Sequence, residues 1–213
     1  GDRKTILPSI PPMLKVGLTG GIATGKSYVL DRFRRRGVPC LDADTLVHGI
    51  EAPGTEATKA IATRFGDGVL AADGSVDRTK LGPVVFADPA ARRELEAIVH
   101  PAVYRAIEAG IRGFELTGRS AFAVVDVPLL FETGAADKFD RVIVTVCPES
   151  AQLARLRERG LSLEAARQRI EAQMATGEKA ARADFVIRTD ATFEETDRQV
   201  DDLIRRLSGG GDV

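Results

Sequence analysis

The sequence contains the stretch Gly20-Gly21-Ile22-Ala23-Thr24-Gly25-Lys26-Ser27, which fits the pattern GxxxxGK[ST]. A strand-like apolar run, Leu14–Thr19, precedes it, and a helical pattern follows it to about Arg36. Glycines let a backbone wrap closely around phosphate oxygens. Amides and a helix N-terminus attract anions, a lysine adds positive charge, and a serine hydroxyl can bind magnesium. A complete motif in this setting favours a phosphate-binding loop over a chance glycine-rich turn.

We predict that this loop binds ATP, with magnesium as the metal cofactor. The predicted ATP contacts are Gly20, Gly21, Ala23, Thr24, Gly25, Lys26, Ser27 and Tyr28. Lys26 and a magnesium ion on Ser27 are expected to hold the β- and γ-phosphates during transfer. The pattern alone leaves kinases, ATPases, GTPases and sulfotransferase-like proteins open, because the loop binds phosphate and does not select the acceptor.

Short apolar runs rich in β-branched residues recur along the chain and alternate with helical patterns. They lie at Leu14–Thr19, Val38–Asp42, Ala121–Val127, Val142–Cys147 and Phe185–Ile187. This alternation predicts an α/β fold, in which helices flank a parallel sheet. The segments Phe122–Val127 and Arg141–Val146 are too apolar to have one wet face, so we expect them to lie centrally in the sheet.

Two segments interrupt the alternation. Between the second and third strands the apolar spacing predicts helices at Ala57–Phe65 and Ala90–Ile111, which indicates an inserted helical subdomain at about 46–118. An arginine-rich helical stretch, Glu149–Ala175, separates the fourth and fifth strands and would be a lid in a kinase, at about 149–178. The remaining segments, 13–45, 119–148 and 179–208, then form the core of one domain that spans 13–208.

Composition limits the partners. The chain has 213 residues, which suits one compact domain, and its 30 basic and 31 acidic residues nearly cancel. We therefore expect no nucleic acid and no membrane as a main partner, and no motif indicates an obligate protein partner. Cys40 and Cys147 have no metal-ligand or disulfide-framework spacing, which suits a cytoplasmic location. Residues 1–12 lack an apolar signal segment and are expected to be an extension or a remnant of cloning.

Three carboxylates follow predicted strands. Asp42 and Asp44 come at the end of the second strand, where ligands collect in open α/β sheets. From spacing alone, either could take a proton from a hydroxyl group or merely cap the next helix. Asp126 closes the third strand and is a candidate to hold magnesium through water, with a turn-capping role as the alternative.

These residues, together with others, resemble the dephospho-CoA kinase family. The matches, in order, are LTGGIxxGKS at Leu18–Ser27, Asp42–Asp44, Pro53–Thr55 with a later Phe65-Gly66, Asp77-Arg78 with Leu81 and Phe86, Leu95 with His100-Pro101, Val127–Glu132, Gln152 with Arg155 and Arg159, Arg169 with Gln173, and Lys179 before Ala183-Asp184. They extend from Leu14 to about Thr192. An ordered series of this length is far more specific than the loop alone.

The resemblance implies transfer of the γ-phosphoryl group of ATP to the ribose 3′-hydroxyl of dephospho-CoA. It implies a three-layer P-loop NTPase core, a helical CoA-binding insertion and a helical lid. Asp44 is implied as the base near the acceptor ribose, and Arg155 of the lid could place its guanidinium against the transferring group. The predicted substrate contacts are Asp42, Asp44, His100, Leu129 and Leu130, and the predicted metal ligands are Ser27 and Asp126.

The chain departs from the family pattern at a few positions. Ala23-Thr24 replaces the usual Gly-Ser, Tyr28 replaces a threonine, and Thr189 replaces the asparagine that usually closes ADxVIxN. We expect nucleotide preference to be affected more than the basic chemistry. Two alternatives are a kinase acting on another nucleoside or nucleotide and a P-loop ATPase or switch. The chain contains no asparagine and therefore no NKxD guanine reader, which weakens the GTPase switch.

Overall fold

The computed structural model describes residues 12–118 and 120–209. The extension predicted at residues 1–12 therefore lies, apart from Pro12, outside the described residues. Five strands form one parallel sheet: β1 (Leu14–Gly20), β2 (Cys40–Asp42), β3 (Phe122–Asp126), β4 (Arg141–Val146) and β5 (Phe185–Arg188). Their order is β2-β3-β1-β4-β5, so all five predicted strands are confirmed and the two predicted central strands are not at an edge.

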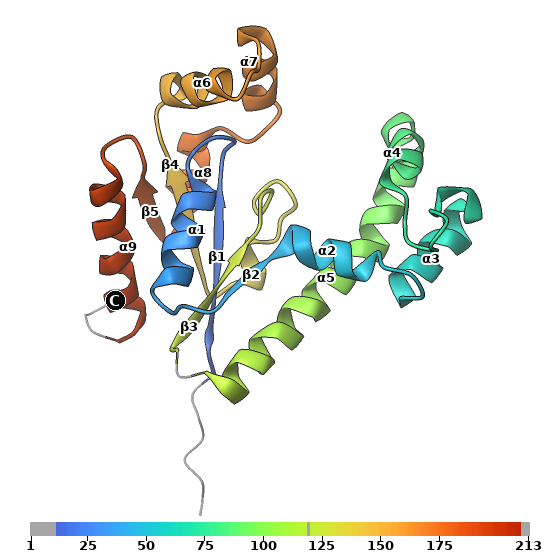
Figure 1. The fold of residues 1–213 in the computed structure, drawn as a ribbon, viewed down its shortest axis with the longest axis horizontal. Helices are drawn as coiled ribbons and strands as arrows, with labels where there is room; N and C mark the ends of the chain where they lie inside the picture. The colour runs from blue at the N-terminus through green and yellow to red at the C-terminus, as the bar shows by residue number, and fades with distance from the viewer. Residues whose placement is uncertain (1–11, 119, 210–213) are drawn as a thin grey trace, which may run out of the picture.

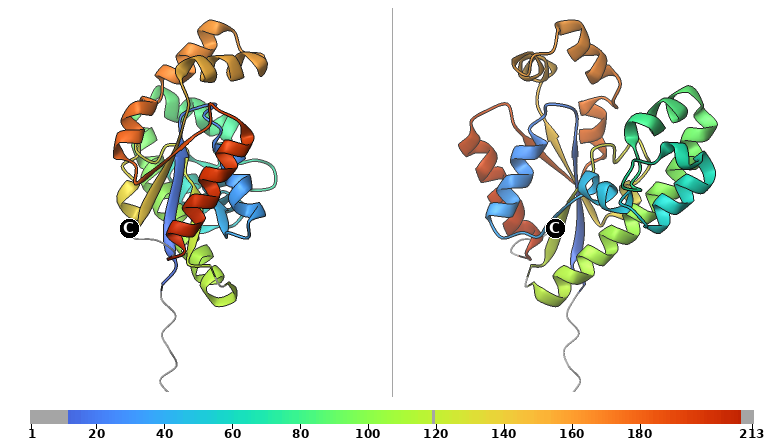
Figure 2. Two further views of the ribbon diagram at one scale, coloured as in Figure 1. Left: turned by 90° about the vertical axis from the view of Figure 1, so that its left-hand side faces the viewer. Right: turned by 45° about the vertical axis from the view of Figure 1, so that its right-hand side comes forward.

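Helices cover both faces of the sheet (Figures 1 and 2). On one face, α1 (Lys26–Arg35) and α9 (Phe193–Leu207) pack against the side chains of Val16 and Leu18. On the other face, α5 (Pro89–Thr117) and α8 (Thr176–Arg182) pack on the alternate residues of β3 and β4. The period-two burial of the strands thus produces the predicted α/β fold in three layers.

The insertion after β2 is helical, as the apolar spacing predicts. It contains α2 (Ala43–Ile50), α3 (Glu56–Phe65), a short 3-10 turn (Asp67–Val69), α4 (Arg78–Ala87) and the first half of α5. It extends away from the sheet in Figure 1 and has a small core of its own. The buried members of that core are Ile61, Val69, Val76 and Leu81. The helix predicted at Ala90–Ile111 extends further, to Thr117, where Gly118 ends it.

The arginine-rich stretch forms two helices, α6 (Glu149–Glu158) and α7 (Leu163–Glu171), above the carboxyl edge of the sheet (Figure 1). A single helical stretch is predicted there, but Gly160 has a φ of 90° and the Ser162 hydroxyl caps α7, so the chain turns between the two. Leu156 and Ala166 form a small core against the loop residues Ile22 and Ala23. Among the described residues, no helix combines the length and apolar character that a membrane crossing requires.

Candidate active site

The glycine-rich loop lies between β1 and α1, at the carboxyl edge of the sheet. Two of its glycines are required by the geometry. A Cβ on Gly20 would lie 2.1 Å from the Thr145 hydroxyl oxygen, and Gly25 has a φ of 85°, with Thr189 only 3.1 Å from where its Cβ would be. A larger residue at either place would push the backbone away from the strands that hold it.

The amides of this loop are arranged to bind an anion. Among the described residues, the backbone N–H groups of Ala23, Gly25, Lys26 and Ser27 have no hydrogen-bond acceptor in the protein. Lys26 and Ser27 form the first turn of α1, so the positive end of that helix adds to the attraction. Consecutive free amides around a helix N-terminus are the usual structure of a phosphate site.

Lys26 of the glycine-rich loop forms an ion pair with Asp126, the last residue of β3. Asp126 is only 7% exposed, and this burial raises the pKa of its carboxyl group, while the charge of Lys26 opposes the rise. The negative charges of Asp42 and Asp44 raise this pKa further. Asp42 and Asp126 are register partners at the ends of adjacent strands.

Asp42 and Asp44 have different surroundings. The Asp42 side chain caps α2, since its Oδ1 accepts hydrogen bonds from the backbone N–H groups of Asp44 at 2.9 Å and Thr45 at 3.2 Å. The Asp44 side chain is exposed and has no hydrogen-bond partner among the residues that the structure describes. Of the two, Asp44 is therefore the carboxylate that is available to a ligand.

A pocket of about 470 Å³ opens beside the loop, on the side of α9. It is lined by Gly25, Tyr28, Arg155, Arg159, Thr189, Ala191, Thr192, Phe193, Glu194 and Thr196. The rings of Tyr28 and Phe193 lie 4.8 Å apart, and Phe193 is 69% exposed. Aromatic faces next to a phosphate loop suit a nucleobase. Tyr28 is among the predicted contacts, whereas Phe193 is not, because a lone aromatic residue at a helix start gives no signal in the sequence.

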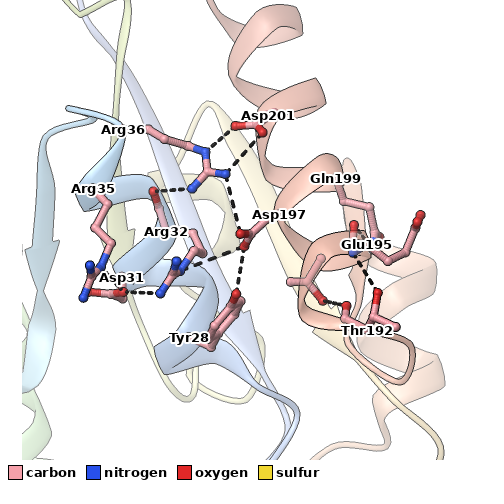
Figure 3. Close-up of polar contacts among 11 residues, drawn as sticks. Tyr28, Asp31, Arg32, Arg35, Arg36, Thr192, Glu195, Asp197, Gln199 and Asp201 are labelled. Atoms are coloured by element: carbon pink, nitrogen blue, oxygen red, sulfur yellow. Dashed lines mark hydrogen bonds and ion pairs between the residues drawn. The ribbon is translucent and has the colours of Figure 1, made fainter.

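Tyr28 is held from two sides, as Figure 3 shows. Its hydroxyl donates a hydrogen bond of 2.9 Å to Asp197 on α9, and the guanidinium carbon of Arg32 lies 4.5 Å from the centre of its ring. Burial raises the pKa of Tyr28, and the hydrogen bond to Asp197 raises it further. The ring is therefore fixed at the wall of the pocket.

Arg155 lies at the same pocket, but its guanidinium group contacts main-chain oxygens. It donates to the carbonyl oxygen of Ala23 at 2.9 Å and to that of Thr189 at 2.5 Å. The predicted contact with a transferring phosphoryl group stays a prediction. Thr189, where the family pattern has asparagine, is buried, and its hydroxyl donates to the carbonyl oxygen of Thr24 at 2.7 Å.

The remaining predicted substrate contacts lie in different environments. Leu130 has no exposed surface and packs against Gly17 in the main core, and the prediction that it contacts substrate stays a prediction. Its neighbour Leu129 is 41% exposed and stays a candidate. His100 is half-buried on α5, at the start of the helix's sheet-packed half.

The chain is similar to known proteins in family, sequence and structure. The family described as "Dephospho-CoA kinase" matches residues 14–195. A dephospho-CoA kinase of Symbiobacterium thermophilum is 46% identical over 92% of this chain and 82% of its own length. One of Leifsonia xyli subsp. xyli is 44% identical over 92% of this chain and 100% of its own length.

Solved structures agree with these matches. A dephospho-CoA kinase from Campylobacter jejuni superposes with a TM-score of 0.70 at 30% identity, covering 92% of this chain and 98% of its own. A crystal structure from Thermus thermophilus superposes with a TM-score of 0.77, also at 30% identity, covering 92% of this chain and 99% of its own. The similarity therefore includes the insertion and the lid as well as the sheet.

Proposed function

This chain belongs to the dephospho-CoA kinase family, and from that premise we propose that it transfers the γ-phosphoryl group of ATP to the ribose 3′-hydroxyl of dephospho-CoA. One observation carries the proposal. Lys26, in a loop of acceptor-free amides, pairs with Asp126, and the unengaged carboxylate of Asp44 is near enough to affect Asp126. A donor phosphate and an acceptor hydroxyl can meet over this pair. Phosphoryl transfer requires that positioning and charge neutralisation more than covalent chemistry.

The loop and Lys26 hold the donor in this proposal. The free amides of Ala23, Gly25, Lys26 and Ser27 bind phosphate oxygens, and the triphosphate takes over the Lys26 ammonium group from Asp126. The nucleobase occupies the pocket between Tyr28 and the lid arginines. Arg155 could add positive charge to the transferring group once a ligand draws its guanidinium from the carbonyl oxygens.

Asp44 is the proposed base. Its carboxylate accepts the proton of the 3′-hydroxyl while the ribose oxygen forms a bond to the γ-phosphorus and the bond from that phosphorus to the β–γ bridging oxygen breaks, leaving ADP. Asp42 helps indirectly, because capping fixes the start of α2 and so fixes Asp44. His100 and Leu129 stay proposed acceptor contacts on the side of the insertion.

Magnesium fits the oxygen donors that are present. Ser27 is exposed at the first turn of α1, and the Asp126 carboxylate lies beside Lys26. Mg²⁺ is usually held by one or two such oxygens together with substrate phosphates and water. When bound with ATP it would neutralise charge on the β- and γ-phosphates. We place the reaction in the cytoplasm, with ATP and dephospho-CoA as the partners and no nucleic acid, membrane or obligate protein partner.

Product analysis tests the proposal. Purified protein is incubated with magnesium, ATP and dephospho-CoA, with adenosine, AMP and acceptor-free reactions in parallel, and the products are identified by mass spectrometry. We expect coenzyme A and ADP only where dephospho-CoA is present. Phosphorylation of adenosine or AMP instead would indicate another nucleoside or nucleotide kinase. ATP hydrolysis without any phosphorylated acceptor would indicate an ATPase.

A further inference from the structure

Side chains from outside the phosphate loop hold its carbonyl oxygens. Gln152 of α6 donates from Nε2 to the carbonyl oxygen of Ile22 at 2.8 Å, and the Thr189 hydroxyl donates to that of Thr24 at 2.7 Å. Between them, Arg155 donates to the carbonyl oxygen of Ala23. Successive carbonyl groups of the loop are thus bound by the lid and by the residue that follows β5.

The loop needs this support, because its own conformation is unfavourable. Ala23 has a φ of 59° and is the only non-glycine residue with a positive φ among the described residues. A left-handed conformation of this kind costs an alanine roughly 1–2 kcal/mol. Ala23 also packs with Ile22 against Leu156 and Ala166 of the lid, so both its side chain and its backbone depend on α6 and α7.

These carbonyl contacts set the direction of the amides. A peptide unit is planar, and its C=O and the following N–H point in opposite directions. When Gln152 fixes the Ile22 carbonyl group toward the lid, the Ala23 N–H points away from the lid. In the same way, the Thr189 hydroxyl on the Thr24 carbonyl group directs the Gly25 N–H. Both amides belong to the acceptor-free set of the candidate phosphate site.

We propose that Gln152 and Thr189 are positioning residues that orient the Ala23 and Gly25 amides toward the phosphates of ATP. The inference rests on the proposed function, since it takes ATP as the donor. Gln152 is 3% exposed and does not line the nucleobase pocket, so its effect on ATP is exerted through the loop. The proposal predicts that removing the Gln152 donor lowers the affinity for ATP and leaves the affinity for adenosine unchanged.

The first test uses Gln152→Met, which keeps the length of the side chain and removes its donor. Equilibrium binding of ATP and of adenosine is measured without any acceptor. Loss of one buried hydrogen bond that presets the loop should weaken ATP binding roughly fivefold. Adenosine binding should stay within about twofold. The matched control is Gln168→Met, the same change at an exposed glutamine of α7 whose side chain donates to Glu164, and it should bind ATP as the wild type does.

The second test uses Thr189→Val and Thr189→Ser. Valine has the shape of threonine without the hydroxyl group, whereas serine keeps it. The valine variant should lose ATP affinity as Gln152→Met does, and the serine variant should retain it. This pair keeps the proposal testable if Gln152→Met fails to fold, which thermal melting reveals. Because Thr189 also lines the nucleobase pocket, the comparison with adenosine is made with Gln152→Met. Unchanged ATP affinity in Thr189→Val, or equal losses for ATP and adenosine in Gln152→Met, would overturn the positioning role.

The two proposals fail in different ways. The binding measurements contain no acceptor, so they do not depend on dephospho-CoA. Suppose that the wild type makes no coenzyme A, and that Gln152→Met loses affinity for ATP but not for adenosine. That result would overturn the proposed acceptor and support the positioning role. If the wild type makes coenzyme A and both Gln152→Met and Thr189→Val bind ATP as the wild type does, the proposed function is supported and the positioning role is overturned.

Discussion

Asp42 and Asp44 stand two residues apart, and the geometry of α2 gives them separate tasks. Asp42 precedes the helix with extended backbone dihedrals, so its side chain folds back onto the free N–H groups of the first turn. Asp44 is already inside that turn and cannot cap it. Its carboxylate stays exposed, within electrostatic range of Asp126. The sequence leaves capping and chemistry open for both residues, because spacing does not show where the helix begins.

We predict that Asp44→Asn lowers kcat by roughly 10²–10⁴-fold, because an amide has nearly the shape of the carboxylate and cannot accept the proton. The dissociation constant for ATP, measured by calorimetry, should stay within about twofold. Asp42→Asn is the matched control, since an asparagine still caps the helix. Wild-type turnover by Asp44→Asn would remove it from the mechanism.

Cys40 gives a pH-dependent prediction. Burial raises the pKa of its thiol to about 11, with Arg34 opposing the rise, and burial also raises the pKa of Cys147. Because only the thiolate reacts, both cysteines should be alkylated slowly by iodoacetamide in the native protein at pH 8. The rate for Cys40 should still be rising near pH 11. Unfolding in guanidinium chloride should make both thiols react quickly at pH 8, and rapid native labelling would contradict the prediction.

The loop and the carboxylates could be predicted from sequence because local motifs specify them. Phe193 and the main-chain contacts of Arg155 could not, since each depends on residues that are distant in the chain. The burial of Leu130 could not be predicted either. This residue stands beside Leu129 in the same motif, but one side chain fills the core and the other is exposed, and an irregular segment has no period that would separate them.

At the scale of elements, α1 and α9 are joined by a polar seam (Figure 3). Arg36 donates hydrogen bonds to Asp201, and Asp197 accepts one from Tyr28, so α9 supports a residue that lines the nucleobase pocket. The C-terminal helix therefore does more than cover the sheet. It holds the aromatic wall beside the phosphate loop.

Substitution of Tyr28 tests the seam. Tyr28→Ala removes both the ring and its hydroxyl, and we expect the KM for ATP to rise about tenfold at saturating dephospho-CoA, because stacking on an aromatic face contributes about 1 kcal/mol or slightly more. Tyr28→Phe keeps the ring and loses the hydrogen bond to Asp197, so a rise of no more than about fivefold is expected. Equal KM values for the two variants would mean that the ring does not contact the nucleotide.

The elements themselves were largely predictable. Strands and helices differ in hydrophobic period, and all five strands and the helices α3 and α5 of the insertion follow from it. The division of the arginine-rich stretch into α6 and α7 was not predicted, because a helical spacing of charged and apolar residues continues on both sides of the turn at Gly160. The pairing order of the strands also lies beyond the periodicity, since it arises from how the connections cross the sheet.

At the scale of the whole molecule, an ion pair between the buried Lys179 and the partly exposed Glu132 joins α8 to the segment after β3. Lys179 of α8 has no exposed surface, and its ammonium group lies 2.9 and 3.1 Å from the two carboxylate oxygens of Glu132. Glu132 follows Leu129 and Leu130, so the pair connects the segment of the candidate acceptor contacts to α8 on the sheet. The sequence shows the two residues but not that they meet.

We predict that Glu132→Gln lowers the free energy of unfolding by about 3 kcal/mol, because it leaves the Lys179 charge buried without a counter-ion. Urea denaturation measures the loss. The control Glu178→Gln breaks the exposed pair with Arg182, at 2.6 Å on the same helix, and should change stability by no more than about 0.5 kcal/mol. If the two substitutions lower the free energy of unfolding equally, the buried Lys179 does not need Glu132 as a counter-ion.

Helix α5 connects two cores. Leu95, Ile98 and Val99 pack in the insertion, and the later part of the helix packs on the sheet, with Pro101 between them. Proline has no N–H, so the helix lacks one backbone hydrogen bond at that point and bends there more easily than elsewhere. Helix α5 thus consists of two segments with a hinge at Pro101. With a rise of about 1.5 Å per residue, a bend of about 10° at Pro101 moves the first turn of the helix by about 3 Å.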